Sequence, residues 1–249
     1  MQPHRGASWL NAQPDDPVAC TAPVAAVCAA SPQAPAVAQD GGPVIRTEEQ
    51  TGRPGLERAA PPWPMQPGLV ERPADASRRH GTPCWIAKCD VASGAVVAPT
   101  LGPSRTEEDF AAPMARTSAT APEAPWRFIV DQRNTPKSEA LVRLVASACD
   151  IAEDLGAKEK RGRWPSMSTR AAFLREVSHR IRFLDTPQHP SWRNHIARWC
   201  SIVVRRLLRR GNCTSVEDLR ERILAFIAYC NKTMAKPFKW TSKGRPLTV

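Results

Sequence analysis

The stretch WRFIVD, Trp126 to Asp131, and the stretch KSEALVRLVASAC, Lys137 to Cys149, decide the fold class. The first is apolar, contains β-branched residues and ends on a carboxylate, which predicts a buried strand. In the second, apolar residues recur at helical spacing, which predicts an amphipathic helix; they are Ala140, Leu141, Leu144, Val145 and Ala148. A strand followed at once by such a helix is typical of α/β proteins.

Upstream of this unit, two more stretches are rich in β-forming residues. Residues 44–50, VIRTEEQ, predict a strand, and residues 85–97, WIAKCDVASGAVV, predict a hairpin that turns at Ala92-Ser93-Gly94. Thr106–Arg116 begins like a helix, with a threonine and three acidic residues, and Pro113 is expected to interrupt it. The acidic trio is better explained by that helix start than by a metal site.

The remaining upstream segments have no such pattern. Residues 53–82 are rich in proline and arginine and are expected to form a loop. Residues 1–43, rich in alanine and proline, are expected to be a linker or disordered, so the folded domain is predicted to span 44–249.

Downstream, the chain changes to helix. Residues 154–169 are expected to be a charged loop and residues 180–184 a short strand. One long helix is predicted from about Trp192 to Arg210, and another begins after the cap Thr214-Ser215 and runs to about Asn231. This order predicts an α/β domain with a mixed sheet flanked by helices and a helical C-terminal end.

The net positive charge is confined to the second half of the chain. Residues 126–249 hold 25 Lys and Arg against 11 Asp and Glu, whereas residues 1–125 hold 10 against 13. Four arginines cluster near the end of a predicted helix: Arg205, Arg206, Arg209 and Arg210. Such a surface fits the phosphate backbone of DNA, although a solvated helix end would have the same composition.

Eight cysteines occur without a CxxC pair and without histidines at zinc-binding spacing. They are expected to be reduced thiols of a cytoplasmic protein. No apolar run reaches the length of a membrane span, so no membrane association is expected.

Residues 186–249 contain longer motifs: TPQHPSWRN, ARWCS and the run RRLLRRGNCTSVEDLRERILAFIAYCNKTMAKPFKWTSKGRPL. This region resembles the end of the DDE domain in transposases of bacterial insertion sequences of the mariner superfamily. The resemblance extends back through FIVDQRNTPKSEALVRLV (128–145), GPSRTEEDF (102–110) and VIRTEEQTG (44–52). It implies an RNase H-like fold and a chain that corresponds to the C-terminal catalytic part of such a transposase.

The resemblance also implies a site in which three carboxylates hold two Mg²⁺ or Mn²⁺ ions. One ion activates the nucleophile that attacks a phosphodiester, and the other stabilises the leaving oxygen. The family's first Asp matches Glu48, its second Asp matches Asp131, and its Glu matches Ala197. Asp131 and Glu48 are therefore the candidate catalytic and metal-binding residues, and the third ligand is missing.

These changes predict weak metal binding. Glu48 is one methylene longer than Asp, about 1.5 Å in an extended side chain, and Mg²⁺ tolerates such a displacement poorly. We therefore expect a transposase that has decayed and retains DNA binding; an active enzyme with a substitute ligand is the first alternative. The other alternative is a non-catalytic module that binds DNA, or forms a homodimer or a heterodimer with an intact transposase, and interferes with it. No helix-turn-helix pattern occurs in residues 1–43, so recognition of terminal repeats is expected to be absent.

Overall fold

The computed structural model describes residues 42–50, 54–72, 76–102, 106–130, 138–152, 155–157, 161–162, 166–185, 195–209 and 211–236. The prediction of a linker in residues 1–43 falls almost entirely outside them, and the first described strand begins at Val44. Among the described helices, none is long and apolar enough to cross a membrane.

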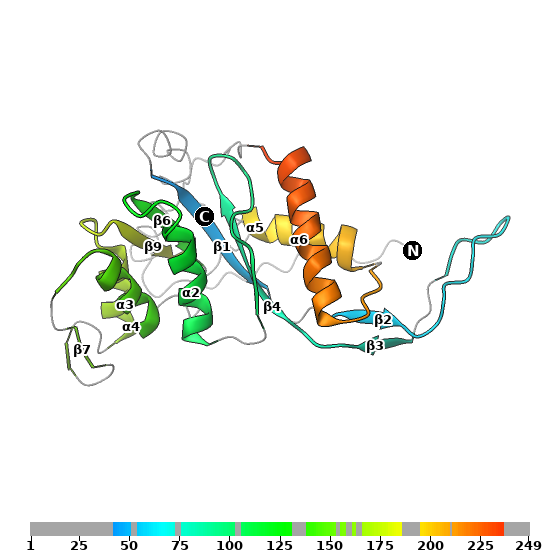
Figure 1. The fold of residues 1–249 in the computed structure, drawn as a ribbon, viewed down its shortest axis with the longest axis horizontal. Helices are drawn as coiled ribbons and strands as arrows, with labels where there is room; N and C mark the ends of the chain where they lie inside the picture. The colour runs from blue at the N-terminus through cyan, green and yellow to red at the C-terminus, as the bar shows by residue number, and fades with distance from the viewer. Residues whose placement is uncertain are drawn as a thin grey trace, which may run out of the picture.

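A five-stranded mixed sheet forms the centre of the fold (Figure 1), with the strand order β5-β4-β1-β6-β9. β4 is antiparallel to both β1 and β5, whereas β1, β6 and β9 are parallel to one another. The strands are β1 (Val44–Gln50), β4 (Cys84–Asp90), β5 (Thr100–Gly102), β6 (Trp126–Val130) and β9 (Ile181–Asp185). The predicted α/β class and the mixed sheet flanked by helices are confirmed.

Three helices cover one face of this sheet: α2 (Glu107–Ser118), α3 (Glu139–Ala148) and α4 (Met167–Arg175). Their apolar faces bury the main core against the strands; its largest members include Phe110, Met114, Leu141, Phe128, Phe183 and Phe173. Stacked rings at 5.1 Å join Phe128 of β6 to Phe183 of β9. The strand-then-helix unit that decided the fold class thus lies at the centre of this core.

The other face is covered by α5 (His195–Val203) and α6 (Val216–Thr233). Their buried residues pack on β4 and include Ile196, Cys200, Val203, Leu219, Ile223 and Ile227. Asn231, near the end of α6, binds both backbone groups of Val96, at 2.9 Å and 2.8 Å. These two hydrogen bonds fasten the C-terminal helix to the segment that follows β4.

The prediction of one long helix over 192–210 is wrong in its second half. After Val203 the chain continues as a π-helix, η3 (Val204–Leu208), in which the Arg209 N–H donates to the Val204 carbonyl at 2.8 Å. Residues 192–194 and Arg210 lie outside the described residues. A π-helix widens the turn by one residue and has no simple sequence signal.

Pro113 does not interrupt its helix, contrary to expectation. α2 runs unbroken through it, begins with a capping box between Thr106 and Asp109, and buries Phe110 and Met114. Proline removes one backbone hydrogen bond, and the packing of the helix on the sheet compensates for the loss. The acidic residues lie at the helix start, and the Glu107 carboxylate also accepts the Glu139 N–H of α3 at 3.1 Å.

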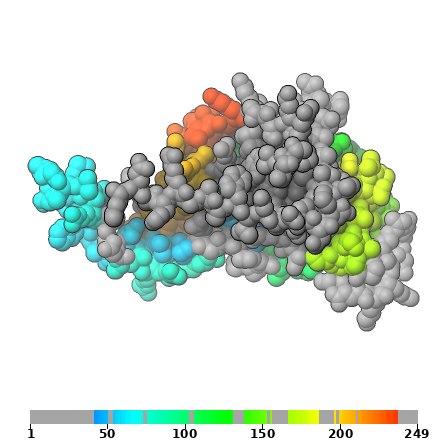
Figure 2. Space-filling model, turned by 180° about the vertical axis from the view of Figure 1, so that it is seen from behind, coloured from blue at the N-terminus to red at the C-terminus, as the bar shows by residue number. Residues whose placement is uncertain are grey.

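Two predicted loops contain regular structure. Within 154–169, β7 (Gly156–Ala157) pairs with β8 (Arg161–Gly162), and α4 begins at Met167 after the cap Ser166. Within 53–82, β2 (Leu56–Arg58) pairs with β3 (Ser77–Arg79), and the chain between them forms a two-stranded hairpin. We call residues 54–82 the arm; Figures 1 and 2 show it projecting from the body of the protein.

Candidate functional site

Glu48 lies near the end of β1, opposite Ala87 of β4. Ala87 and Trp85, which lies two residues before it, belong to the core beneath α5. Residues paired across two strands share a face of the sheet. Glu48 therefore points to the face that α5 covers. Its Oε1 accepts a hydrogen bond from Nε2 of Gln50 at 3.3 Å.

Cys200 of α5 interacts electrostatically with the Glu48 carboxylate. Burial, and next the negative charge of Glu48, raise the pKa of the Cys200 thiol far above its ordinary value. On the same side of β4, burial and the Asp90 carboxylate raise the pKa of Cys89 to about 11. Both groups are thus protonated thiols at neutral pH, and neither replaces a carboxylate as a ligand for a hard cation.

β1 and β6 are parallel neighbours, paired from Val44 with Arg127 to Arg46 with Ile129. Their carboxyl ends therefore lie at the same edge of the sheet, as the prediction for Glu48 and Asp131 requires. Asp131 follows directly after Val130, the last residue of β6, but lies outside the described residues. The strand arrangement is confirmed, whereas the role of Asp131 as a ligand stays a prediction.

Position 197 belongs to the first turn of α5, the helix that faces Glu48. An alanine there supplies no oxygen to a metal. Within the part of the chain that the structure describes, no group of three His, Cys, Asp or Glu side chains could hold an ion. Of the two candidate ligands, Glu48 alone lies among those residues.

Asp185 ends β9 and is another buried carboxylate near this edge, but it serves a different purpose. It pairs with Val130 in the sheet, one position before Asp131, so it points to the face opposite Glu48. There Arg175 of α4 donates a hydrogen bond to its Oδ2 at 2.5 Å. Asp185 thus ties α4 to the sheet and does not substitute for the missing ligand.

Three of the four predicted DNA-binding arginines are described, and all three are exposed: Arg205, Arg206 and Arg209. They lie on η3 and the turn after it, where Nε of Arg205 donates to the Ser201 carbonyl at 3.3 Å. Arg210 lies outside the described residues. Their exposure is compatible with phosphate contacts, and their role stays a prediction.

The tip of the arm carries an apolar surface that sequence reasoning missed. Gln66 and Leu69 bond to each other around Pro67-Gly68, and Gly68 has a φ of +78°, as the third position of a type II turn requires. The tip surface consists of Trp63, Met65, Leu69 and Val70, which are 53% to 78% exposed. The proline–glycine pair was the available signal for this hairpin.

A family model described as DDE superfamily endonuclease matches residues 53–220, more than half of the chain. Sequence comparison with curated proteins found no match.

Among solved structures, the Mos1 mariner paired end complex with Mn is similar at 9% identity over 92% of this chain, with a TM-score of 0.49. The Mos1 Strand Transfer Complex is similar at 8% identity over 91% of this chain, with a TM-score of 0.48. The chain spans 60% and 58% of the length of those two chains.

Proposed function

Because the chain belongs to the DDE superfamily endonuclease family, we propose that it is an insertion-sequence transposase domain that has lost most of its ability to cut DNA. The observation that carries the proposal is the state of its metal-binding positions. Glu48 faces α5 with a carboxylate that is one methylene too long, and residue 197 of α5 is an alanine. Glu48 and Asp131 leave two cations under-neutralised, so Mg²⁺ and Mn²⁺ bind weakly.

The test is metal-dependent nicking of a supercoiled plasmid. Purified protein with Mg²⁺ or Mn²⁺ is expected to produce no more open circles than the Asp131→Ala variant, since the ions carry the reaction. Nicking by the unaltered protein that disappears in Asp131→Ala would show a working site and would contradict the proposal. It would favour the alternative in which another residue supplies the missing ligand.

The decayed domain is located in the cytoplasm and retains the ability to bind duplex DNA. The exposed arginines of η3 and the excess of positive charge after residue 126 support it. Such binding is independent of sequence and weakens steeply between about 50 and 200 mM salt. Changing Arg205, Arg206, Arg209 and Arg210 together to alanine is expected to flatten that dependence, and an unchanged dependence would contradict phosphate contact.

A second function, pairing with another transposase chain, is favoured by the tip of the arm. A two-stranded hairpin alone is marginally stable in water, and its apolar side chains gain stability when they are buried. The partner we propose is a second copy of this chain or the matching arm of an intact transposase. A partner without a working metal site would make the mixed dimer inactive, which is the interference proposed from the sequence.

Sedimentation of matched variants tests this pairing. Val70 on the tip and Val177 elsewhere on the surface are 78% and 76% exposed, so each can be changed to serine at equal cost to the monomer. Val70→Ser is expected to weaken self-association about tenfold, roughly 1.4 kcal/mol, while Val177→Ser leaves it unchanged. Equal effects of the two changes, or a wild type that stays monomeric at all concentrations, would contradict pairing through the tip.

A further inference from the structure

The arm carries positive charge as well as an apolar tip. Arg58, Arg78 and Arg79 lie toward the root, on β2 and β3, whereas Arg72 lies farther out, paired with Trp63 of the tip surface. The described acidic residues of the arm are Glu57 and Glu71, and Glu57 binds Nε2 of His80 at 2.6 Å. Arg72, Arg78 and Arg79 are exposed.

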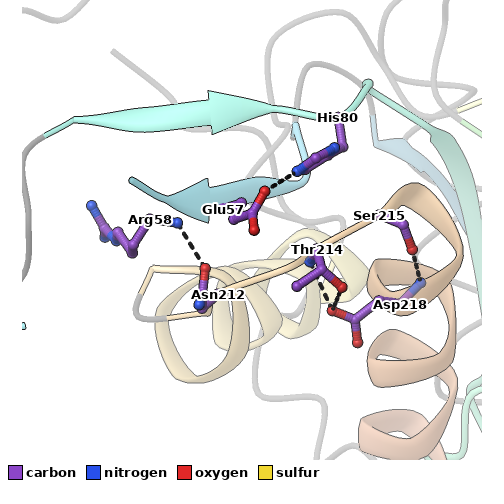
Figure 3. Close-up of polar contacts among 7 residues, drawn as sticks. All are labelled: Glu57, Arg58, His80, Asn212, Thr214, Ser215 and Asp218. Atoms are coloured by element: carbon purple, nitrogen blue, oxygen red, sulfur yellow. Dashed lines mark hydrogen bonds and ion pairs between the residues drawn. The ribbon is translucent and has the colours of Figure 1, made fainter. Parts of the chain in front are cut away.

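The root of the arm is fastened to the turn that follows η3 (Figure 3). Oδ1 of Asn212 accepts the Arg58 N–H at 2.7 Å, and the Cys213 N–H donates to the Leu56 carbonyl at 2.8 Å. Gly55 lies against Leu219 of α6, where an added Cβ would approach the leucine side chain to 3.5 Å. The arm is thus attached to the turn between η3 and α6 and to α6 itself.

This attachment brings two sets of cations to one region. Asn212 follows Arg209 by three residues, so the exposed arginines of η3 lie directly before the residue that holds β2. Two hydrogen bonds, one to the Asn212 side chain and one between backbone groups, fix the direction in which the arm leaves the body, because each joins a residue of β2 to the turn. The arginines of the helix end and of the arm root are therefore held in a fixed relation.

The geometry of a two-stranded ribbon suits duplex DNA. Neighbouring residues of a strand point to opposite faces, so Arg78 and Arg79 of β3 leave the ribbon on opposite sides. The major groove of B-DNA, about 12 Å wide, admits such a ribbon and is bordered by a phosphate strand on each side. An arginine on each face can then contact each border, while the apolar tip extends beyond the duplex.

We infer that the arm is a second DNA contact: Arg78 and Arg79 at its root, and Arg72 farther along it, extend the basic surface of Arg205, Arg206 and Arg209 across the α5–α6 turn and bind the phosphates of duplex DNA. The inference rests on the proposed DNA binding and assigns part of it to the arm. The contact reads no sequence, because phosphate contacts position a protein on DNA without distinguishing bases.

The test is the salt dependence of DNA binding by the full chain and three triple-alanine variants, with a fluorescent duplex of arbitrary sequence as the probe. The arm variant changes Arg72, Arg78 and Arg79, and the helix variant changes Arg205, Arg206 and Arg209. The control removes three exposed cations outside both sets, Arg143, Lys232 and Lys236. Each lost phosphate contact lowers the slope of log K against log salt by about 0.9.

The arm variant is expected to lose roughly 3 from this slope, the helix variant a similar amount, and the control nothing. A wild-type slope in the arm variant, with a reduced slope in the helix variant, would overturn the inference and leave the proposed DNA binding intact. Equal losses in the arm variant and the control would also overturn it, because net charge alone would then explain the effect. A wild type without measurable DNA binding would instead contradict the proposed function itself.

Discussion

Lys88 of β4 is a buried cation whose removal should stabilise the protein. It has no exposed surface, and its Nζ donates to the Pro113 carbonyl at 3.1 Å and to the Thr100 hydroxyl at 3.5 Å. Burial first, and the charge of Arg116 second, lower the pKa of Lys88 from its usual 10.5 to about 7. The perturbation is Lys88→Met, which keeps the length of the side chain and removes the charge.

The sign of the effect follows from proton binding. Between the folded pKa of about 7 and the unfolded value of 10.5, the unfolded chain binds a proton that the folded chain does not, so stability rises with pH. The cost of the charged lysine is fully present below pH 7 and is lost as pH approaches 10.5. At about 1.4 kcal/mol for each pKa unit, the cost differs by up to about 4 kcal/mol between pH 6 and pH 10.

The hydrogen bonds lost with Lys88 reduce this gain only slightly. The Pro113 carbonyl still accepts the Thr117 hydroxyl at 2.8 Å, and the Thr100 hydroxyl still donates to the Ala98 carbonyl at 3.4 Å. Lys88→Met is therefore expected to be more stable than the wild type at pH 6, with the advantage shrinking as the pH rises.

Urea unfolding from pH 6 to pH 10 measures this difference, and the exposed Lys232 of α6 supplies the control change Lys232→Met. Cysteines of the unfolded chain also titrate in this range, but they do so equally in the wild type and the variants. A difference between wild type and Lys88→Met that stays constant across this range would refute the reasoning.

Three further predictions concern other buried contacts. Asn231→Ala should lower the free energy of unfolding by about 2 kcal/mol, because both hydrogen bonds to Val96 are lost. Chemical denaturation at pH 7 checks this. An unchanged free energy of unfolding would contradict the stabilising role of the Asn231 side chain. Arg175→Met should destabilise the protein, because it removes the ion pair that ties α4 to the buried Asp185 carboxylate of β9; thermal unfolding at pH 7 checks this, and an unchanged melting temperature would contradict it. In the folded protein at pH 8, Cys200 should react with iodoacetamide far more slowly than an unfolded cysteine, because it is buried and protonated, and labelling followed by mass spectrometry would reveal a fast reaction.

The central strands and helices could be predicted because their sequence patterns and their burial agree. WRFIVD is apolar where β6 is buried, and the caps at Thr106 and Ser215 lie where α2 and α6 begin. The family resemblance matched Glu48 and Asp131 to the ends of two strands, and the structure pairs those strands, β1 and β6, as parallel neighbours. The sequence did not predict the face of the sheet on which Glu48 lies, which follows from its pairing with Ala87.

The arm, α4 and η3 could not be predicted, each for a physical reason. The arm has no buried face along most of its length, so its strands show no apolar alternation. Four of the apolar residues of α4 are consecutive, Ala171 to Leu174, so they do not show helical spacing. η3 differs from an α-helix by one residue per turn, which periodicity over five residues cannot resolve.

Asp185 illustrates a different limit of sequence reasoning. Its position at the end of a strand resembles that of Asp131, and both follow apolar runs. Only the register shows that Asp185 points to α4 and meets Arg175, because a shift of one residue moves a side chain to the opposite face. A carboxylate at the end of a strand is therefore a candidate ligand only when its face is known.

Calorimetric titration of Mn²⁺ tests most directly the claim that the metal site has decayed. We expect no saturable binding by the unaltered protein at physiological metal concentrations. The variant with both Glu48→Asp and Ala197→Glu is expected to bind more tightly than either single variant, because the ligands share the ions. Tight binding by the unaltered protein that is lost in Asp131→Ala would contradict the account, since it would show a complete metal site in the chain as it stands.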